Sequence, residues 1–324
     1  MKTVTRFAAV LALALVWAGT ARAETLKIGL LPIADTLLLH VAERNGYFNE
    51  EGLSVKLIPF QSFLEKNAAV QAGELDGHFG EVSAVIIQKA AGMPFVIIAS
   101  TSHTSPEARM FGLVSSPKIK PAGLDDLKGR QLAISRLAIV DFLSDVFLES
   151  AQKPADLMIR KDIRKIPVRL QMLLAGQVDA ALFPEPLLSV AENAGGTVLM
   201  DDRGLDMPLA VIALAESKAT PETVDAFRKA LVKAGQAINK EPDKYRTLLM
   251  ELRLIPPNLA ESYKMQPVDL DKIPHTLPSP ALYQRYTDWL IKNGALLNDK
   301  SSSKAQALPR YEEVVWQGGK DERI

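Results

Sequence analysis

A five-residue stretch occurs twice in the chain, 103 positions apart, and it limits what the chain can fold into. Residues 72–76 read Ala-Gly-Glu-Leu-Asp and residues 175–179 read Ala-Gly-Gln-Val-Asp. In each copy the pattern predicts a helix that ends at the glycine, a short strand after the aspartate and then an apolar helix, at 82–91 or 187–194. A strand expected at 130–135 likewise lies 104 residues after one expected at 26–31. The sequence therefore predicts two similar halves.

Strands alternate with helices through the first half of the chain. Strands are expected at 26–31, 53–59, 77–79 and 95–99, with helices at 36–44 and 65–72 between the earlier ones. Such alternation is typical of a mainly parallel sheet covered by helices on both faces. With 324 residues, 48% of them hydrophobic, the chain is long enough for two such domains and for a cleft between them.

The first 23 residues have the features of a secretory signal peptide. Lys2 and Arg6 precede an apolar run at 7–16, and Ala-Arg-Ala at 21–23 matches a small-x-small cleavage site. An apolar run of about ten residues is too short for a membrane anchor, which needs roughly twenty. The mature chain is expected to begin at Glu24, to lack any membrane insertion and to reside in a periplasm.

Composition argues against several classes of function. Without 1–23 the chain carries 35 basic and 38 acidic residues, a balance that creates no strong field for nucleic acid. The absence of cysteine excludes disulfides, thiolate metal sites and a lipid-anchoring cysteine. The four histidines lack metal-ligand spacing, and there is no phosphate loop or Gly-x-Ser-x-Gly motif. We therefore expect a protein that is not an enzyme, with no catalytic residue, no metal and no cofactor.

Residues 42–53 read Ala-Glu-Arg-Asn-Gly-Tyr-Phe-Asn-Glu-Glu-Gly-Leu and follow an expected strand and turn at 28–32. This stretch resembles the start of the nitrate, sulfonate, taurine and thiamine-precursor substrate-binding proteins of ATP-binding-cassette importers. In that family a helix ends in Ala-x-x-x-Gly-Tyr-Phe, followed by acidic residues and Gly-Leu. The resemblance continues through 72–76, 127–129, 174–181 and Pro-Glu-Pro at 184–186, so it extends over nearly the whole mature chain.

The resemblance implies a type II periplasmic-binding-protein fold, in which two α/β lobes joined by a double crossover hinge enclose an interlobe cleft. Lobe one would comprise 24–112 and 213–324, and lobe two 113–212, with crossovers near 111–115 and 209–213. The implied function is that of a monomeric solute-binding component of an importer. It would capture a small organic molecule, such as a sulfonate, a carboxylate or a heterocycle, by lobe closure and deliver it to a membrane permease.

Two alternatives use the same fold. The first is a periplasmic sensor that signals its bound state to a membrane receptor. The second is a periplasmic enzyme, which would have to turn its ligand over. Fold alone does not separate these functions, because a few side chains at the site decide them.

Ligand-binding residues are expected just after strand ends and at the lobe crossing. In open α/β sheets the carboxyl ends of parallel strands and the following helix starts face the cleft. The candidates are Ile33, Asp35, Gln61, Ser62, Glu81, Ser83, Thr101, Ser102, Arg109, Ser135, Arg136, Phe183 and Glu185.

The polar candidates of the first half also have a structural interpretation. Gln61, Ser62 and Ser83 can cap the helices behind them instead of contacting a ligand. Glu81 can be stabilised by N–H groups at its own helix start, or it can bind an amine or ring N–H of a ligand.

In the second half, Phe183 either stacks on the ligand or belongs to the core. Arg109 and Arg136 can bind a carboxylate or sulfonate with a planar fork, or they can be solvated at the surface or form a hinge salt bridge. The bulky run 137–140, Leu-Ala-Ile-Val, stands where the family often has glycines and small hydroxyl residues. It favours a partly apolar ligand over a backbone nest for an anion.

Overall fold

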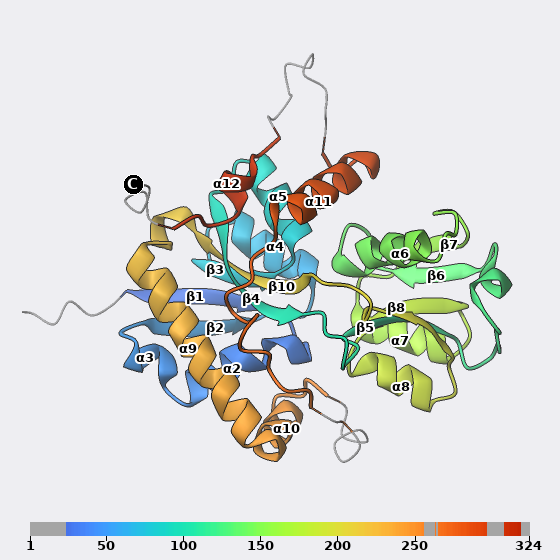
Figure 1. Ribbon diagram of the computed structural model, residues 1–324, viewed down its shortest axis with the longest axis horizontal. Helices are drawn as coiled ribbons and strands as arrows, with labels where there is room; N and C mark the ends of the chain where they lie inside the picture. Colours follow the sequence, from blue (N-terminus) through green and yellow to red (C-terminus); the bar gives the residue numbers. More distant parts are fainter. Residues whose placement is uncertain (1–23, 256–262, 264, 297–307, 319–324) are drawn as a thin grey trace, which may run out of the picture.

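The computed structural model describes residues 24–255, 263, 265–296 and 308–318. The expected signal peptide lies outside these residues. Two five-stranded sheets form two lobes that lie side by side (Figure 1). The first sheet has the strand order β2-β1-β3-β10-β4 and the second β7-β6-β8-β5-β9. The strands are β1 (Thr25–Leu30), β2 (Ser54–Pro59), β3 (Gly77–Gly80), β4 (Phe95–His103), β5 (Phe111–Ser115), β6 (Gln131–Ile134), β7 (Ile159–Asp162), β8 (Ala180–Pro184), β9 (Val198–Asp201) and β10 (Pro208–Ala215).

Helices cover both sheets. Within the described part of the chain, none combines the length and the apolar character needed to cross a bilayer. The α-helices are α2 (Leu37–Arg44), α3 (Tyr47–Glu50), α4 (Phe63–Gln71), α5 (Val82–Ala90), α6 (Ile139–Ser150), α7 (Ile166–Leu174), α8 (Leu187–Asn193), α9 (Pro221–Lys240), α10 (Pro242–Glu251), α11 (Pro280–Lys292) and α12 (Tyr311–Val314), and a short 3-10 helix, η1 (Ala34–Thr36), precedes α2.

The two sheets have the same topology. β1 pairs in parallel with β2 and β3, as β6 does with β7 and β8. β10 is antiparallel to β3 and β4, and β5 is antiparallel to β8 and β9. One strand of the first sheet, β10, returns only after the second sheet is complete. This arrangement confirms the expected α/β fold of two lobes.

The repeated five-residue stretches occupy equivalent places in the two sheets. Gly73 and Gly176 follow α4 and α7 with φ of +70° and +75°, a left-handed conformation that favours glycine. The Asp76 carboxylate accepts a hydrogen bond from a backbone N–H of β1, and Asp179 accepts the corresponding bond from β6, each at 2.9 Å. In both lobes the repeat therefore ends one helix and fastens the parallel pair at the centre of the sheet.

Two segments connect the lobes, 104–110 between β4 and β5 and 202–207 between β9 and β10. The stretches 111–115 and 209–213, expected to be crossovers, instead lie inside β5 and β10. Every residue of β5 is buried, so the apolar run belongs to the sheet and not to the connection. β4 also extends past its expected end at 99 to His103.

Helix α11 contacts both lobes, and Figure 1 shows it above the gap between them. It packs against α5 of the first lobe. Its Tyr286 ring stacks on Phe142 of α6, in the second lobe, with 4.0 Å between ring centroids. The Trp289 ring meets Phe142 edge-on at 5.5 Å, and its indole N–H donates to Asp145 at 2.8 Å. One hydrophobic core therefore continues from one lobe into the other.

Gly77 begins β3 at a close approach to β10. A Cβ atom built there would lie 2.5 Å from Leu214 Cδ2 and 2.7 Å from the carbonyl oxygen of Ala213. We expect Gly77→Ala to lower the free energy of unfolding by about 1–3 kcal/mol, because backbone must move to admit the methyl group. Gly123→Ala is the control, since a Cβ there meets nothing within 4 Å. Equal urea midpoints for the two variants would contradict the expectation.

Candidate functional site

Two cavities lie between the lobes, and the candidate residues divide between them. The interlobe cavity, of about 590 Å³, is lined by residues that follow β1, β2 and β3 of the first sheet and β6 and β7 of the second. The hinge cavity, of about 810 Å³, lies against the crossover segment 104–110. The interlobe cavity is lined by Ile33, Gln61, Ser62, Glu81 and Ser135, the hinge cavity by Asp35, Thr101, Ser102, Arg109 and Glu185, and neither by Ser83, Arg136 and Phe183.

At the interlobe cavity, Ser62 is the N-cap of α4. Its hydroxyl accepts a hydrogen bond from the backbone N–H of Glu65 at 3.1 Å, and the Glu65 carboxylate accepts one from the backbone N–H of Gln61 at 3.0 Å. The first of these bonds caps one N–H group in the first turn of α4 without a ligand. Both candidates nevertheless border the cavity, where the Gln61 side chain is exposed.

Glu81 and Ser83 make contacts between the lobes. Glu81 stands at the N-cap position of α5, yet its carboxylate accepts a hydrogen bond from the backbone N–H of Ile139, at the start of α6 in the other lobe, at 2.8 Å. The Ser83 hydroxyl donates to the carbonyl oxygen of Leu137 at 3.3 Å. Capping of α5 is one of the two interpretations of each residue, and neither side chain caps it, because the start of the facing helix lies within reach. Burial raises the pKa of Glu81 to about 7, although the Ile139 N–H opposes the shift.

A buried lysine lies behind Glu81. Lys66, on α4, is 0% exposed, and its ammonium group donates to the carbonyl oxygen of Phe79 at 2.5 Å and lies 3.3 Å from His78 Nδ1. Burial lowers the pKa of Lys66 to about 7, against the attraction of Glu81. Lys66 and Glu81 are therefore close enough inside the first lobe for the charge of each to oppose the pKa shift of the other.

The second lobe contributes a buried arginine. Arg169, on α7, is 1% exposed and lines the interlobe cavity. Its Nη1 donates to the carbonyl oxygen of Ile163 at 3.1 Å, and its guanidinium lies 5.2 Å from the centre of the Phe183 ring. Its Nε has no hydrogen-bond partner among the described residues. Burial lowers the pKa of Arg169 to about 10, with Glu81 opposing, so the group remains charged at neutral pH.

The charges and walls of the interlobe cavity suit an acidic molecule with an apolar body. Three arginines line it, Arg164, Arg169 and Arg253, against one carboxylate, that of Glu81. A guanidinium with an unused N–H can hold a carboxylate or sulfonate through charge-assisted hydrogen bonds. The apolar lining includes Phe63, Phe79, Phe111, Ile139, Val140 and Leu170.

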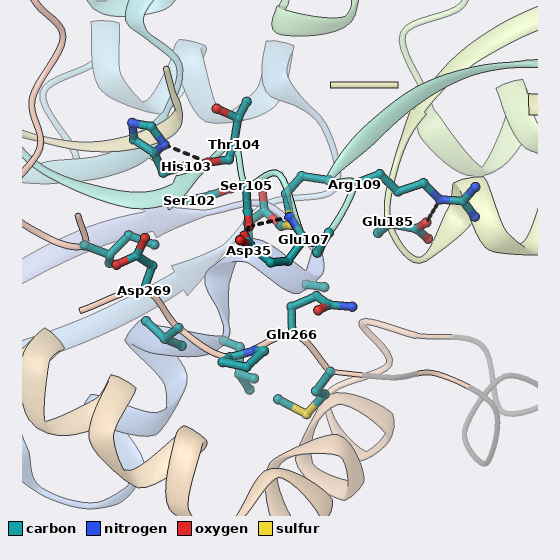
Figure 2. Close-up of a pocket in the computed structure, with 18 of the residues that line it drawn as sticks. Asp35, Ser102, His103, Thr104, Ser105, Glu107, Arg109, Glu185, Gln266 and Asp269 are labelled. Carbon is teal, nitrogen blue, oxygen red and sulfur yellow. Dashed lines mark hydrogen bonds and ion pairs between the residues drawn. The ribbon is translucent and has the colours of Figure 1, made fainter. Parts of the chain in front are cut away.

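In the hinge cavity, Asp35 lies beside Ser102 and Ser105 (Figure 2). It borders the cavity and is partly exposed. Burial raises the pKa of Asp35 to about 7, and the negative charge of Asp202 adds to the shift. The Ser102 hydroxyl faces the carboxylate but does not complete a hydrogen bond of standard geometry.

Arg109 and Glu185 form an ion pair at the other end of the hinge cavity (Figure 2). Arg109 Nε donates to Glu185 at 2.7 Å, and the same guanidinium pairs with Glu192. Glu185 also accepts from the backbone N–H of Ser189 at 3.1 Å. Arg109 therefore forms a salt bridge at the hinge, one of the interpretations of this residue.

The three remaining candidates are placed as follows. Phe183 is 0% exposed, in the core beneath Arg169. Arg136 is exposed, with its Nε 3.8 Å from Asp141. Ser83 is buried and bonded across the lobes.

Sequence reasoning missed Arg169, the buried cation of the cavity. Its signal is a single charged residue in an otherwise apolar helix, Ile-Pro-Val-Arg-Leu-Gln-Met-Leu-Leu. A lone arginine in such a helix is buried only if something satisfies its charge. Lys66 carried no comparable signal, because α4 also contains polar residues that face solvent.

Comparison with protein families gives one match and one curated relative. A family model described as NMT1/THI5 like matches residues 34–245. Over 235 residues, or 66% of the chain, the sequence is 28% identical to the nitrate import ATP-binding protein NrtC of Synechococcus elongatus, and the match covers 35% of that protein. The chain thus spans about a third of the length of this relative.

Solved structures of periplasmic binding proteins share the fold. The aliphatic sulphonate binding protein SsuA of Escherichia coli matches with a TM-score of 0.71 at 18% identity, over 91% of this chain and 93% of that one. SsuA of Xanthomonas axonopodis pv. citri, bound to MOPS, matches with a TM-score of 0.69 at 16% identity, over 91% and 99%. The nitrate-binding protein NrtA of Synechocystis PCC 6803 matches with a TM-score of 0.66 at 14% identity, over 91% and 86%. All three are binding proteins, and at these identities the likeness establishes the two-lobed fold.

Proposed function

The chain belongs to the NMT1/THI5-like family, and from this premise we propose that it is the solute-binding component of an ATP-binding-cassette importer. In this role it is exported to the periplasm, binds a small organic molecule between its lobes and presents the closed form to a membrane permease. The proposed lobes divide at the crossover segments 104–110 and 202–207. Family membership and the binding-protein fold support the role.

One observation carries the proposal. The segments that follow the parallel strands of both sheets converge on the interlobe cavity. Ligands of open α/β sheets bind at such strand ends, where helix starts offer unpaired N–H groups. Because the two lobes supply opposite walls, a solute between them is contacted from both sides and favours closure.

The solute we propose is an organic acid, a carboxylate or a sulfonate, with an apolar body. Its acidic group pairs with Arg169. The Nε of this arginine has no hydrogen-bond partner among the described residues. Its body lies against the aromatic and aliphatic walls of the cavity. The hydrogen bonds between Ile139 and Glu81 and between Ser83 and Leu137 join the lobes beside it.

The test replaces the buried arginine by a residue of similar length without charge. In thermal-shift assays of the unaltered protein with benzoate, alkanesulfonates, nitrate and pyrimidines, we expect one class of organic acid to raise the melting temperature. Arg169→Met is expected to lower the affinity for that acid at least tenfold, because the acidic group loses its partner. The variant should remain folded, since replacing a poorly satisfied buried charge by an apolar side chain is often neutral or stabilising.

Arg44→Met is the matched control. Arg44 is exposed and pairs with Glu251 at the surface, so the variant removes an arginine without touching either cavity. Its affinity for the acid should stay within twofold of the unaltered protein. A panel in which no small molecule shifts the melting temperature, or chemical conversion of the bound compound, would argue against a solute-binding role.

A further inference from the structure

We propose that the hinge cavity is a second binding site, which takes an organic cation whose ammonium or amidinium group pairs with Asp35. The site lies apart from the residues proposed to hold the acidic solute. The inference stands on the charges, unpartnered polar atoms and walls of this cavity and does not need the proposed function to be right.

The charge of the hinge cavity is opposite to that of the interlobe cavity. Four carboxylates line it, those of Asp35, Glu107, Glu185 and Asp269, against two guanidinium groups. Both guanidinium groups already have carboxylate partners, since Arg109 pairs with Glu185 and Glu192, and Arg203 pairs with Asp201 at 2.6 Å. Asp35 makes no ion pair with any described residue. A cation in the cavity would supply the missing partner.

Two hydroxyl groups of residues that line the cavity are also without hydrogen-bond partners among the described residues. Thr101 and Ser102 line the cavity from the end of β4 and are 4% and 3% exposed. Neither hydroxyl oxygen has a hydrogen-bond partner within the described parts of the chain. Buried hydroxyl groups are normally hydrogen-bonded, and leaving one unpaired is unfavourable. Hydroxyl oxygens can accept the N–H groups of an ammonium or amidinium that Asp35 holds.

A second carboxylate strengthens the negative field behind Asp35. Asp202 is 0% exposed, and its Oδ1 accepts hydrogen bonds from the backbone N–H groups of Met110 and Phe111 at 2.8 and 3.0 Å. Its Oδ2 has no partner among the residues described. The carboxylates of Asp35 and of the buried Asp202 repel each other when both are ionised, and a cation at Asp35 relieves that repulsion.

The remaining lining residues of the hinge cavity favour an organic cation that carries apolar groups. The apolar side chains that line the cavity include Leu37, Leu38, Ile238, Leu249, Met265 and Ile273. Its volume of about 810 Å³ exceeds what an inorganic ion needs and suits a ring-sized molecule. Because 104–110 connects the lobes and lines the cavity, a bound cation contacts one of the two segments that join the lobes. Any effect of the cation on solute affinity must then be matched by an equal effect of the solute on cation affinity.

The experiment compares three molecules of one shape by isothermal titration calorimetry. Benzamidine carries the cation, benzamide is its neutral counterpart and benzoate is the anion. We expect benzamidine to bind at least tenfold more tightly than benzamide, and Asp35→Asn to lower its affinity at least tenfold. Thr101→Val removes one hydrogen-bond acceptor and keeps the shape of the side chain. It is expected to lower the affinity for benzamidine severalfold, and it still tests the site if Asp35→Asn folds poorly.

Glu74→Gln is the control for the loss of one carboxylate. Glu74 is exposed and lines neither cavity, so benzamidine affinity should change less than twofold. Equal binding of benzamide and benzamidine, or full benzamidine affinity in Asp35→Asn, would overturn the proposal. Loss of benzamidine binding in Arg169→Met would overturn it as well, because it would mean one shared site. Each of these outcomes leaves the separate test with organic acids and Arg169→Met in place.

Discussion

Phe142→Ala is expected to lower the free energy of unfolding by about 3–5 kcal/mol and to let the two lobes unfold in separate steps. The Phe142 ring is 1% exposed and lies between Tyr286 and Trp289 of α11, at centroid distances of 4.0 and 5.5 Å. Because α11 also packs on α5, these rings form a direct apolar connection between the lobes. Truncation leaves a cavity at that connection, and the protein loses both buried area and interlobe coupling.

Differential scanning calorimetry of the variant and of Phe227→Ala tests this expectation. Phe227, on α9, is 0% exposed and packs on Phe48 of α3 at 5.0 Å, entirely within the first lobe. Its truncation removes the same volume and should cost a similar free energy, but it should leave a single transition. The connection assigned to α11 would be refuted if Phe142→Ala unfolded in one step with a loss below 1 kcal/mol.

The architecture could be predicted because its signals are local. The repeat at 72–76 and 175–179 indicates the end of a helix, a glycine with positive φ and an aspartate that bonds the backbone of the neighbouring strand. All of these features depend on a few residues of the repeat and its surroundings. The lobe crossings could not be placed in the same way. An apolar run such as 111–115 is compatible with a buried strand and with a buried connection. Only the pairing of β5 with β8 decides between the two.

The site was predictable only in part, because the position of a strand end indicates where a residue lies but not what its side chain contacts. Glu81 and Ser83 follow β3 as expected, but what they contact depends on how closely the second lobe approaches. Thr101 and Ser102 resemble loop residues in sequence, yet they continue β4, and their hydroxyls border the hinge cavity. Arg169 belongs to an apolar helix, and its role appears only once both lobes are in place.

Replacing Asp35 by asparagine is expected to stabilise the protein more as the pH rises. Burial, aided by the charge of Asp202, raises the pKa of Asp35 to about 7, whereas in the unfolded chain this carboxyl titrates near its ordinary value, about 4. Between these values the folded protein holds a proton that the unfolded chain releases. Rising pH therefore favours unfolding over that interval, and the contribution of Asp35 to stability, complete below about pH 4, is lost as the pH passes 7.

The difference in unfolding free energy between Asp35→Asn and the unaltered protein isolates this titration from that of every other carboxylate. It should be smallest near pH 4.5, grow steadily to pH 7 and level off at about 2–4 kcal/mol by pH 8. Urea titrations at half-unit steps of pH measure it, and Glu74→Gln, a substitution at an exposed position that lines neither cavity, should run parallel to the unaltered protein. Benzamidine should reduce the difference at pH 8, because a cation beside the ionised carboxylate stabilises only the protein that retains Asp35. A difference that does not change with pH would mean that Asp35 is ionised in the folded protein throughout, with its charge already compensated.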